Sequence, residues 1–595
     1  MVKTIGLPGF PLRLSVRVLY LLEFSAASCT RDDICITILR HMYEAAVFLC
    51  SDESLTVSFN LLRKALITEY NRNSSAAVLN VRKVTAATGG NMTKTTEKTL
   101  EYVLNTLREA EQYVHAIHVL NFDLETICPS EAMQEQGEVI AFLSDKAYRL
   151  QKQKKFILAG EYLYEHRDEL CEYDKVLAES LHRNYIRTKN ITPAMNNRFD
   201  LIYNKAFVDW VNAKQSDDYS LFRDSLGKVR DAQLKMISLN GEALPIKYDN
   251  LLSIYDRGMT TEKLDEVFGE CKDRLIPLLE KIKKSRKKIR TDFLSRPVSD
   301  EQQRQFSQYL LEVQGYDFTR GAFTTTEHPF TDGLGRNDAR VTTHYYPDAL
   351  ISSMYSIIHE GGHALFEQNF PREHYDHFIY DEKTMSQHES VSRFYENRIG
   401  RSQAYIDLIW DKACEIFPNV FYDVTPLEFY EAINVAQPSL IRTEADEFTY
   451  TFHIIIRYEM EKEIINNKAS IRSLPSMWKK KYRDYLGVVP KGYADGILQD
   501  VHWSSGFGYF PTYAMGNMYN AMYYNKMAQT FDIDSLVRNG DFATINGWMK
   551  ENVWKKADLL TSEEWIKDIT GREFTAKDFL DYLEDKYTRD RKSTR

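Results

Sequence analysis

Apolar residues recur at helical spacing over most of the chain after Met92, and long amphipathic stretches with many charges cover residues 147–177 and 261–293. The first helix is expected behind a short polar lead with the composition of a helix start. Its apolar positions stand three and four residues apart: Leu100, Val103, Leu104 and Leu107. The pattern predicts a mostly α protein.

Two segments, Tyr316–Thr326 and Arg340–Tyr346, break this pattern with β-branched and aromatic residues. A connection rich in glycine, aspartate and proline separates them, so a small β-hairpin is expected here. The helical pattern returns over Asp348–Asn369, where Asp348 is suited to cap the helix.

Residues 1–91 lack this periodicity and end in the loop-like run Ala86–Asn91. The apolar stretch Ile5–Ser28 is interrupted by prolines and charges, so it cannot span a bilayer comfortably. It imitates a signal peptide weakly, but Glu23 falls inside the apolar part. We expect residues 1–91 to be an extension, presequence or small accessory region, and residues 92–595 to form one large domain.

The composition changes the picture mainly by exclusion. The chain has 595 residues, with 76 basic and 85 acidic side chains and a net charge of −9, so nucleic acid is not the expected partner. Its seven cysteines are scattered and never spaced as CxxC, so neither a disulfide framework nor a thiolate metal site is predicted. A cytoplasmic protein without a membrane partner fits best.

The run His359-Glu360-Gly361-Gly362-His363 matches HExxH and lies within the helix expected over residues 348–369. Residues four apart share one helix face, so both imidazoles can reach one metal ion, with Glu360 beside it to polarise a water. Each glycine costs about 1 kcal/mol relative to alanine inside a helix. The glycines therefore predict a close approach to this backbone, for which a substrate strand is a good candidate.

A third ligand is expected because catalytic zinc commonly takes two histidines and one carboxylate, which leaves a position for water. Glu389 is the preferred candidate and His388 its rival, since both open a further helical pattern. The competing interpretation makes Glu389 a solvated helix carboxylate.

Six ordered motifs resemble the carboxypeptidase Taq family of metallocarboxypeptidases. The similarity covers about residues 92–595, because the segment Asn121–Thr126 also resembles an early family motif, with Phe122 in place of tryptophan. The six motifs are His328-Pro329-Phe330, Asp338–Thr342, His359–His363, His388-Glu389-Ser390, Ile441–Asp446 and Gly496–Trp503.

The resemblance implies a two-lobed, mostly α metallopeptidase with a deep central cleft and a small β-hairpin beside the metal site, usually homodimeric, that removes C-terminal residues from peptides. Its metal ligands carry over to His359, His363 and Glu389, and its general base to Glu360. One divalent ion is implied for each subunit, with Zn²⁺ as the default and Co²⁺ or Mn²⁺ also compatible with these nitrogen and oxygen donors.

The family relationship also suggests that His502 and a following tyrosine donate hydrogen bonds to the developing oxyanion. Tyr513 is preferred and Tyr509 is the runner-up. The alternative is that both tyrosines belong to an aromatic core.

Recognition of a terminal carboxylate suits the planar fork of arginine. Arg442 is the preferred candidate, because its segment follows the metal ligands, and Arg340 is the second. Either arginine could instead be a structural ion-pair partner. His328 is a further candidate for substrate binding, or a hydrogen-bonded loop histidine.

The sequence thus predicts a cytoplasmic, metal-dependent carboxypeptidase of broad specificity that acts on peptides. A helical oligoendopeptidase with the same metal site, cutting internally, is the nearest alternative. A catalytically inactive helical scaffold is the alternative from another class.

Overall fold

The computed structural model describes residues 92–379, 384–467 and 469–588. They belong to one compact unit that begins at Gly90. Residues 1–91 lie outside the described ranges, so the prediction of an N-terminal extension stays a prediction. In the described part of the chain, no helix combines the length and the apolar character that a membrane span needs.

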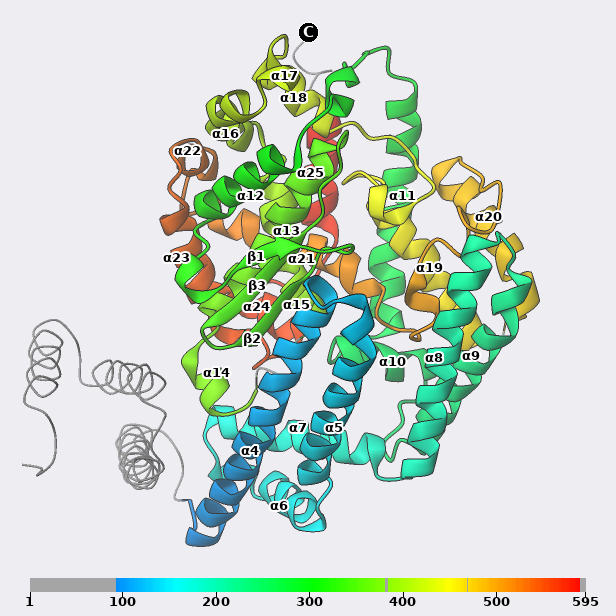
Figure 1. Ribbon diagram of the computed structural model, residues 1–595, viewed down its shortest axis with the longest axis vertical. Coiled ribbons are helices and arrows are strands. Elements are labelled where there is room, and N and C mark those ends of the chain that lie inside the picture. The colour runs from blue at the N-terminus through cyan, green and yellow to red at the C-terminus, as the bar shows by residue number, and fades with distance from the viewer. Residues whose placement is uncertain (1–91, 380–383, 468, 589–595) are drawn as a thin grey trace, which may run out of the picture. The chain divides into compact units, whose positions relative to one another are not determined.

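Helices form most of the described chain, which confirms the predicted fold class (Figure 1). The N-terminal helices are α4 (Lys94–Thr126), α5 (Met133–Gln151), α6 (Lys154–Glu165), α7 (Glu172–Thr188), α8 (Pro193–Gln215), α9 (Ser220–Leu239), α10 (Lys247–Tyr255), α11 (Thr261–Lys283) and α12 (Asp300–Gln314). A small sheet and α13 (Leu350–Asn369), α14 (Arg372–Asp376) and α15 (Met385–Arg393) follow. The C-terminal helices are α16 (Gln403–Ile416), α17 (Pro418–Phe421), α18 (Pro426–Ile433), α19 (Tyr450–Ile465), α20 (Leu474–Leu486), α21 (Pro511–Met527), α22 (Ile533–Arg538), α23 (Phe542–Asn552), α24 (Ser562–Thr570) and α25 (Lys577–Thr588).

The described residues pack around two hydrophobic clusters. The smaller one joins α4, α6 and α7 and takes in Ile379 and Leu559 from later segments. The larger one runs from α8 to α25. Helix α4 begins where the sequence predicts, because the Thr93 side chain accepts a hydrogen bond from the Thr96 amide, and its four predicted apolar positions are buried.

The sheet has three strands in the order β1-β3-β2: β1 (Phe323–Thr325), β2 (Thr331–Gly335) and β3 (Asp338–Thr343). β2 and β3 form an antiparallel hairpin, whereas β1 runs parallel to β3. The expected hairpin between residues 316–326 and 340–346 is therefore wrong, because β2 arises from the connection. Its glycines resemble a turn in the sequence, but in the fold the Glu367 side chain occupies the space beside Gly333 where a Cβ would lie.

Helix α13 lies against the sheet and packs on α12 and α15, while α15 packs in turn on α21 (Figure 1). The helix begins at Leu350, and its N-cap residue, Ala349, provides no side-chain hydrogen bond. The expected cap by Asp348 is therefore wrong. Helix α15 continues directly into a π-helical turn, Phe394–Ile399.

The two glycines of the HExxH run face protein rather than a substrate strand, which corrects that expectation. A Cβ at Gly361 would meet the side chains of Gln314 and Leu311 on α12. A Cβ at Gly362 would lie 2.7 Å from Ser392 Cα and 3.1 Å from Val391 O. The close approach at Gly362 is that of α15, which brings the Glu389 carboxylate to the face of α13 that carries the histidines.

We expect Gly362→Ala to lower the free energy of unfolding by about 2 kcal/mol and to weaken metal binding, because the α15 backbone cannot yield to the added Cβ without separating the helices. Thermal denaturation and metal titration of the purified variant measure both effects. Gly269→Ala in α11 is the matched control: its Cβ meets no heavy atom within 4 Å, so a gain of up to about 1 kcal/mol is expected. Equal changes in the free energy of unfolding and in metal binding for the two variants would contradict the role of Gly362 in helix packing.

Candidate active site and metal ligands

Two histidines and one carboxylate meet where α13 faces α15. His359 Nε2 lies 3.6 Å from Glu389 Oε2, and His363 Nε2 lies 3.4 Å from the same oxygen. One potential ligand atom from each residue falls within 4.8 Å of the others. Ligands about 2.1 Å from a tetrahedral ion stand about 3.4 Å apart. The spacing and the donor set therefore fit a divalent ion such as Zn²⁺.

The far side of each imidazole is also held. His359 Nδ1 donates to Glu396 Oε2 at 2.8 Å. His363 Nδ1 lies 2.6 Å from His388 Nδ1, and His388 Nε2 lies 2.9 Å from Glu367 Oε1. These contacts fix the orientation of both rings. His388, the rival ligand, lies behind His363 and does not join the three-residue cluster.

Arg393 links the two acidic residues of α15 and its π-helical continuation. Its Nε donates to Glu389 Oε1 at 2.7 Å and its Nη1 donates to Glu396 Oε2 at 3.0 Å. Burial alone would raise the pKa of each carboxyl, but Arg393 and the facing histidines outweigh burial. They hold the pKa of Glu389 well below its usual range and lower that of Glu396 to about 2. Both groups are therefore anions at neutral pH.

Strand β2 positions the carboxylate of Glu360. Thr331, the first residue of this strand, donates from Oγ1 to Glu360 Oε2 at 2.7 Å and also lies 2.9 Å from the Glu360 backbone oxygen. Glu360 is buried, at 8% exposure. The Glu360 carboxylate is thus hydrogen-bonded to the sheet, and Glu360 is not one of the three clustered ligand candidates, His359, His363 and Glu389.

A second polar cluster gathers three of the predicted site residues around Asp500. Arg442 Nε donates to Asp500 Oδ2 at 2.6 Å, and the other carboxylate oxygen makes a short contact with His502 Nδ1. His502 Nε2 faces the hydroxyl of Tyr513 at 3.4 Å. Arg442 and His502 together hold the pKa of Asp500 far below its usual value, against the opposing effect of burial.

Tyr450 joins the two clusters. Its hydroxyl lies 3.2 Å from Arg442 Nη1, and the Arg393 guanidinium lies over its ring, 4.3 Å from the centroid. Burial raises the pKa of Tyr513 far above its usual value, and the Glu389 carboxylate adds to the rise. The metal-ligand candidates and the Arg442 cluster therefore share one electrostatic environment.

The remaining predicted residues have other surroundings. Arg340 forms an ion pair with Asp338 at 2.7 Å and lies 5.1 Å from the centre of the Phe122 ring on α4, so these contacts brace the sheet. His328 is exposed in the connection between β1 and β2. Tyr509 stacks on His502 with 5.7 Å between ring centres. Their roles in substrate binding stay predictions.

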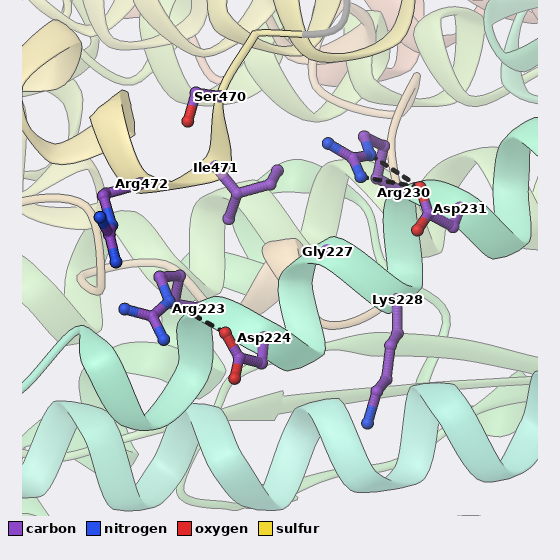
Figure 2. A pocket seen from close by; sticks show the side chains of 9 residues that line it. All are labelled: Arg223, Asp224, Gly227, Lys228, Arg230, Asp231, Ser470, Ile471 and Arg472. Atoms are coloured by element: carbon purple, nitrogen blue, oxygen red, sulfur yellow. Dashed lines mark hydrogen bonds and ion pairs between the residues drawn. The ribbon is translucent and has the colours of Figure 1, made fainter.

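A cavity of about 550 Å³ opens elsewhere, between α9 and the 3₁₀ turn Ile471–Ser473 (Figure 2). Its charges pair largely with sequence neighbours: Arg223 with Asp224 at 2.9 Å, and Arg230 with Asp231 at 2.8 Å. None of the candidate catalytic residues lines this cavity.

Several residues around the site were not among the predicted site residues: Thr331, Glu367, Arg393, Glu396, Tyr450 and Asp500. The spacing of Glu389, Arg393 and Glu396 on one helix face is a signal that could have identified two of them. Asp500 stands two positions before His502 in the same motif. For Thr331 and Glu367, the sequence offers no comparable signal.

Comparison with known proteins decides the family. The family described as carboxypeptidase Taq (M32) metallopeptidase matches residues 102–587. The chain belongs to this family. Several proteins of this family are similar to the chain, and solved structures of family members share the fold of the chain.

Carboxypeptidase 1 of Bacillus subtilis (strain 168) is 38% identical over 485 residues, which cover 81% of this chain and 96% of that protein. Thermostable carboxypeptidase 1 of Thermus thermophilus is 40% identical over 342 residues, or 57% of this chain and 67% of that protein. The crystal structure of the M32 carboxypeptidase from Deinococcus radiodurans R1 superposes with a TM-score of 0.79 at 29% identity, covering 83% of this chain and 99% of that one.

This member of the M32 family is accordingly a metal-dependent carboxypeptidase, which hydrolyses peptide bonds. Its substrates are peptides, and it requires a divalent metal ion. Internal cleavage by a helical oligoendopeptidase is not favoured.

Proposed function

We propose that His359, His363 and Glu389 hold a single Zn²⁺, with Co²⁺ or Mn²⁺ able to replace it. The donor set and the 3.4 and 3.6 Å ligand separations support this assignment. When bound, the ion supplies Lewis acidity that lowers the pKa of water and polarises the scissile carbonyl. Metal analysis of the purified protein and of His363→Gln tests the assignment: a variant that keeps its full metal content would overturn it.

We propose that Glu360 is the general base, which takes a proton from the attacking water and returns it to the leaving amine. Its hydrogen bond from Thr331 supports this role, because the second carboxylate oxygen stays oriented while Oε2 is held. His502 and Tyr513 are proposed to donate to the developing oxyanion. Asp500 supports His502 in that task by fixing the orientation of its ring through the contact with Nδ1.

The terminal carboxylate of the substrate is proposed to bind Arg442, with Arg340 and His328 as further contacts for the peptide. The observation that supports this proposal is that Arg442 is connected to Glu389 through Tyr450 and Arg393. A cation is thereby held in the same buried network as the proposed metal ligands. Such a cation is what distinguishes removal of a terminal residue from internal cleavage.

The expected result follows from that geometry: a free-acid peptide loses C-terminal residues stepwise, and its C-amidated twin does not. The amide removes the negative charge that the Arg442 guanidinium recognises, so binding loses a charge-assisted hydrogen bond. Mass spectrometry of both peptides after incubation, with and without chelator, measures the effect. Chelator is expected to abolish cleavage of the free acid.

Glu360→Gln serves as the control for a contaminating protease, since it must lose the activity as well. Internal cuts in both peptides would contradict the proposed role of Arg442. Activity that survives chelation would contradict the metal assignment.

We further propose a cytoplasmic homodimer of broad specificity, in which residues 92–595 form the catalytic domain and residues 1–91 an extension or presequence. The family resemblance supports the dimer, and the scattered cysteines support the reducing compartment. Sedimentation of the full chain tests the assembly. N-terminal sequencing of the natural protein distinguishes a start at Met1 from one at Met92.

A further inference from the structure

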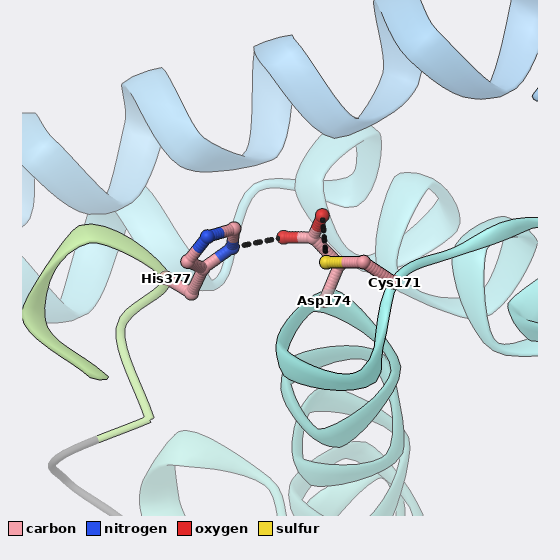
Figure 3. Close-up of side chains that lie close together, drawn as sticks. All are labelled: Cys171, Asp174 and His377. Carbon is pink, nitrogen blue, oxygen red and sulfur yellow. Dashed lines mark hydrogen bonds and ion pairs between the residues drawn. The ribbon is translucent and has the colours of Figure 1, made fainter. Parts of the chain in front are cut away.

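A second group of metal-ligating side chains lies apart from the candidate active site. Cys171, Asp174 and His377 point toward one another (Figure 3). The Cys171 thiol donates to Asp174 Oδ2 at 3.1 Å, and His377 Nδ1 donates to Asp174 Oδ1 at 2.6 Å. One ligand atom from each residue falls within 4.8 Å of the others.

Two distant segments bring these donors together. Cys171 stands just before α7 and Asp174 lies in the first turn of that helix, while His377 follows α14. Asp174 and His377 are 203 positions apart in the chain. The Asp174 side chain is 7% exposed and that of His377 is 22% exposed, so the carboxylate is buried and the cluster keeps access to water.

We propose that Cys171, Asp174 and His377 form a second cation site that takes a borderline-soft divalent ion such as Zn²⁺ or Co²⁺. A sulfur, an oxygen and an imidazole nitrogen are the three ligand types that such ions accept, and water can supply a fourth. The Mg²⁺ and Ca²⁺ ions are excluded as natural occupants because they prefer sites made of oxygen atoms.

The arrangement does not suit a cysteine nucleophile. In a nucleophilic triad the imidazole lies between the thiol and the carboxylate, because it must accept the thiol proton. Here the carboxylate of Asp174 lies between the other two groups. Burial and this neighbouring carboxylate raise the pKa of the Cys171 thiol to about 12, so the thiol keeps its proton at neutral pH unless a cation displaces it.

Ion binding balances as an exchange of a proton for a metal. The Cys171 S–H bond breaks, the sulfur forms a bond to the ion, and the proton leaves to solvent. His377 gives up its Nδ1 proton to solvent and takes one up on Nε2, so Nδ1 is free to bind the ion while the ring stays neutral. Ligands of one tetrahedral ion stand about 3.3 to 3.6 Å apart, so the Cys171 sulfur and the His377 nitrogen each have to move away from the Asp174 carboxylate by less than about 1 Å.

Such an ion would cross-link the start of α7 to the connection between α13 and α15. Helix α7 belongs to the smaller hydrophobic cluster, whereas His377 lies on the connection between α13 and α15, the helices that carry the proposed catalytic ligands. Ile379, two positions after His377, is already buried in the smaller cluster. The ion would stabilise this junction and take no part in hydrolysis.

Cobalt titration of the metal-free full-length protein tests the proposal. Thiolate ligation of Co²⁺ produces an intense near-ultraviolet charge-transfer absorption. The proposed catalytic ligands contain no sulfur, so this band reports the second site alone. The band is expected in the unmodified protein and in His359→Gln, and two cobalt ions per chain are expected to bind in the unmodified protein but only one in His359→Gln.

Cys171→Ser and His377→Gln probe the site, because serine and glutamine can both still donate a hydrogen bond to Asp174. Both variants are expected to lose the second cobalt ion and, with it, the band. Cys128→Ser and His182→Gln are the matched controls, since His182 forms a similar carboxylate contact with Glu161 at 2.9 Å. The two control variants are expected to keep the second cobalt ion and the band. Circular dichroism without metal confirms that each variant folds.

A single cobalt ion per chain without a thiolate band would overturn the proposal. A band that persists in Cys171→Ser would also overturn it and would assign the thiolate to another cysteine. The sequence spacing predicted no thiolate site, because the histidine ligand lies too far from Cys171 in the chain for any motif to connect them.

Discussion

Glu360→Gln is expected to lower kcat by a factor of about 10³ while the metal content stays unchanged. Glutamine has the shape of glutamate and can still accept the hydrogen bond that Thr331 donates at 2.7 Å. It cannot take a proton from the attacking water. Because Glu360 is absent from the ligand cluster of His359, His363 and Glu389, its charge is not needed to hold the ion.

Steady-state kinetics on a free-acid peptide, together with metal analysis of the same preparation, measures the two halves of this prediction. Glu389→Gln is the contrasting variant: it should lose metal, and its activity should return in part when excess metal is added. Thr331→Val keeps the base and removes only its hydrogen bond, so a decrease of about tenfold is expected. Full kcat in Glu360→Gln would contradict the assignment of the base.

The proximity of the two candidate histidines could be predicted from the sequence because their geometry is local. His359 and His363 are one helical turn apart, so a helical pattern alone places them on one face. Glu389 is the preferred third candidate, but only the family resemblance sets it above the alternatives, since nothing in the spacing between α13 and α15 says how the two helices meet. The structural reason for that meeting is Gly362, whose missing side chain lets the backbone at Ser392 approach.

The pairing of the strands could not be predicted, because it depends on contacts with another layer. β2 contains Asp332, Gly333 and Gly335, which favour a turn when taken alone. In the fold, the Glu367 side chain fills the space beside Gly333, and Thr331 reaches Glu360. The strand therefore forms for a tertiary reason that no local propensity records.

The buried charges around the site were also beyond prediction from the sequence alone. Arg393 is neutralised by Glu389 and Glu396 together, and its guanidinium lies over Tyr450. Each of these residues would be costly to bury alone, and only the complete set satisfies its charges. The network therefore depends on three segments at once, whereas sequence patterns describe one segment at a time.

Arg442→Gln is expected to lower kcat/KM for a free-acid peptide by about 100-fold, corresponding to about 3 kcal/mol for the loss of a charge-assisted hydrogen bond. Most of the loss should appear in KM, because the substrate carboxylate is bound in the ground state as well as in the transition state. The C-amidated peptide gains nothing from the guanidinium, so its slow cleavage should change little. The preference for the free acid should therefore collapse in this variant.

Arg340→Gln is the matched control, because both arginines form an ion pair with an aspartate and both are candidates for the carboxylate. Arg340 forms its ion pair with Asp338 of the sheet and lies over the Phe122 ring, and its side chain is 28% exposed against 12% for Arg442. We expect Arg340→Gln to keep the preference for the free acid. If Arg340→Gln loses that preference and Arg442→Gln keeps it, the carboxylate site belongs to the sheet, and Arg442 acts only by holding Asp500 against His502.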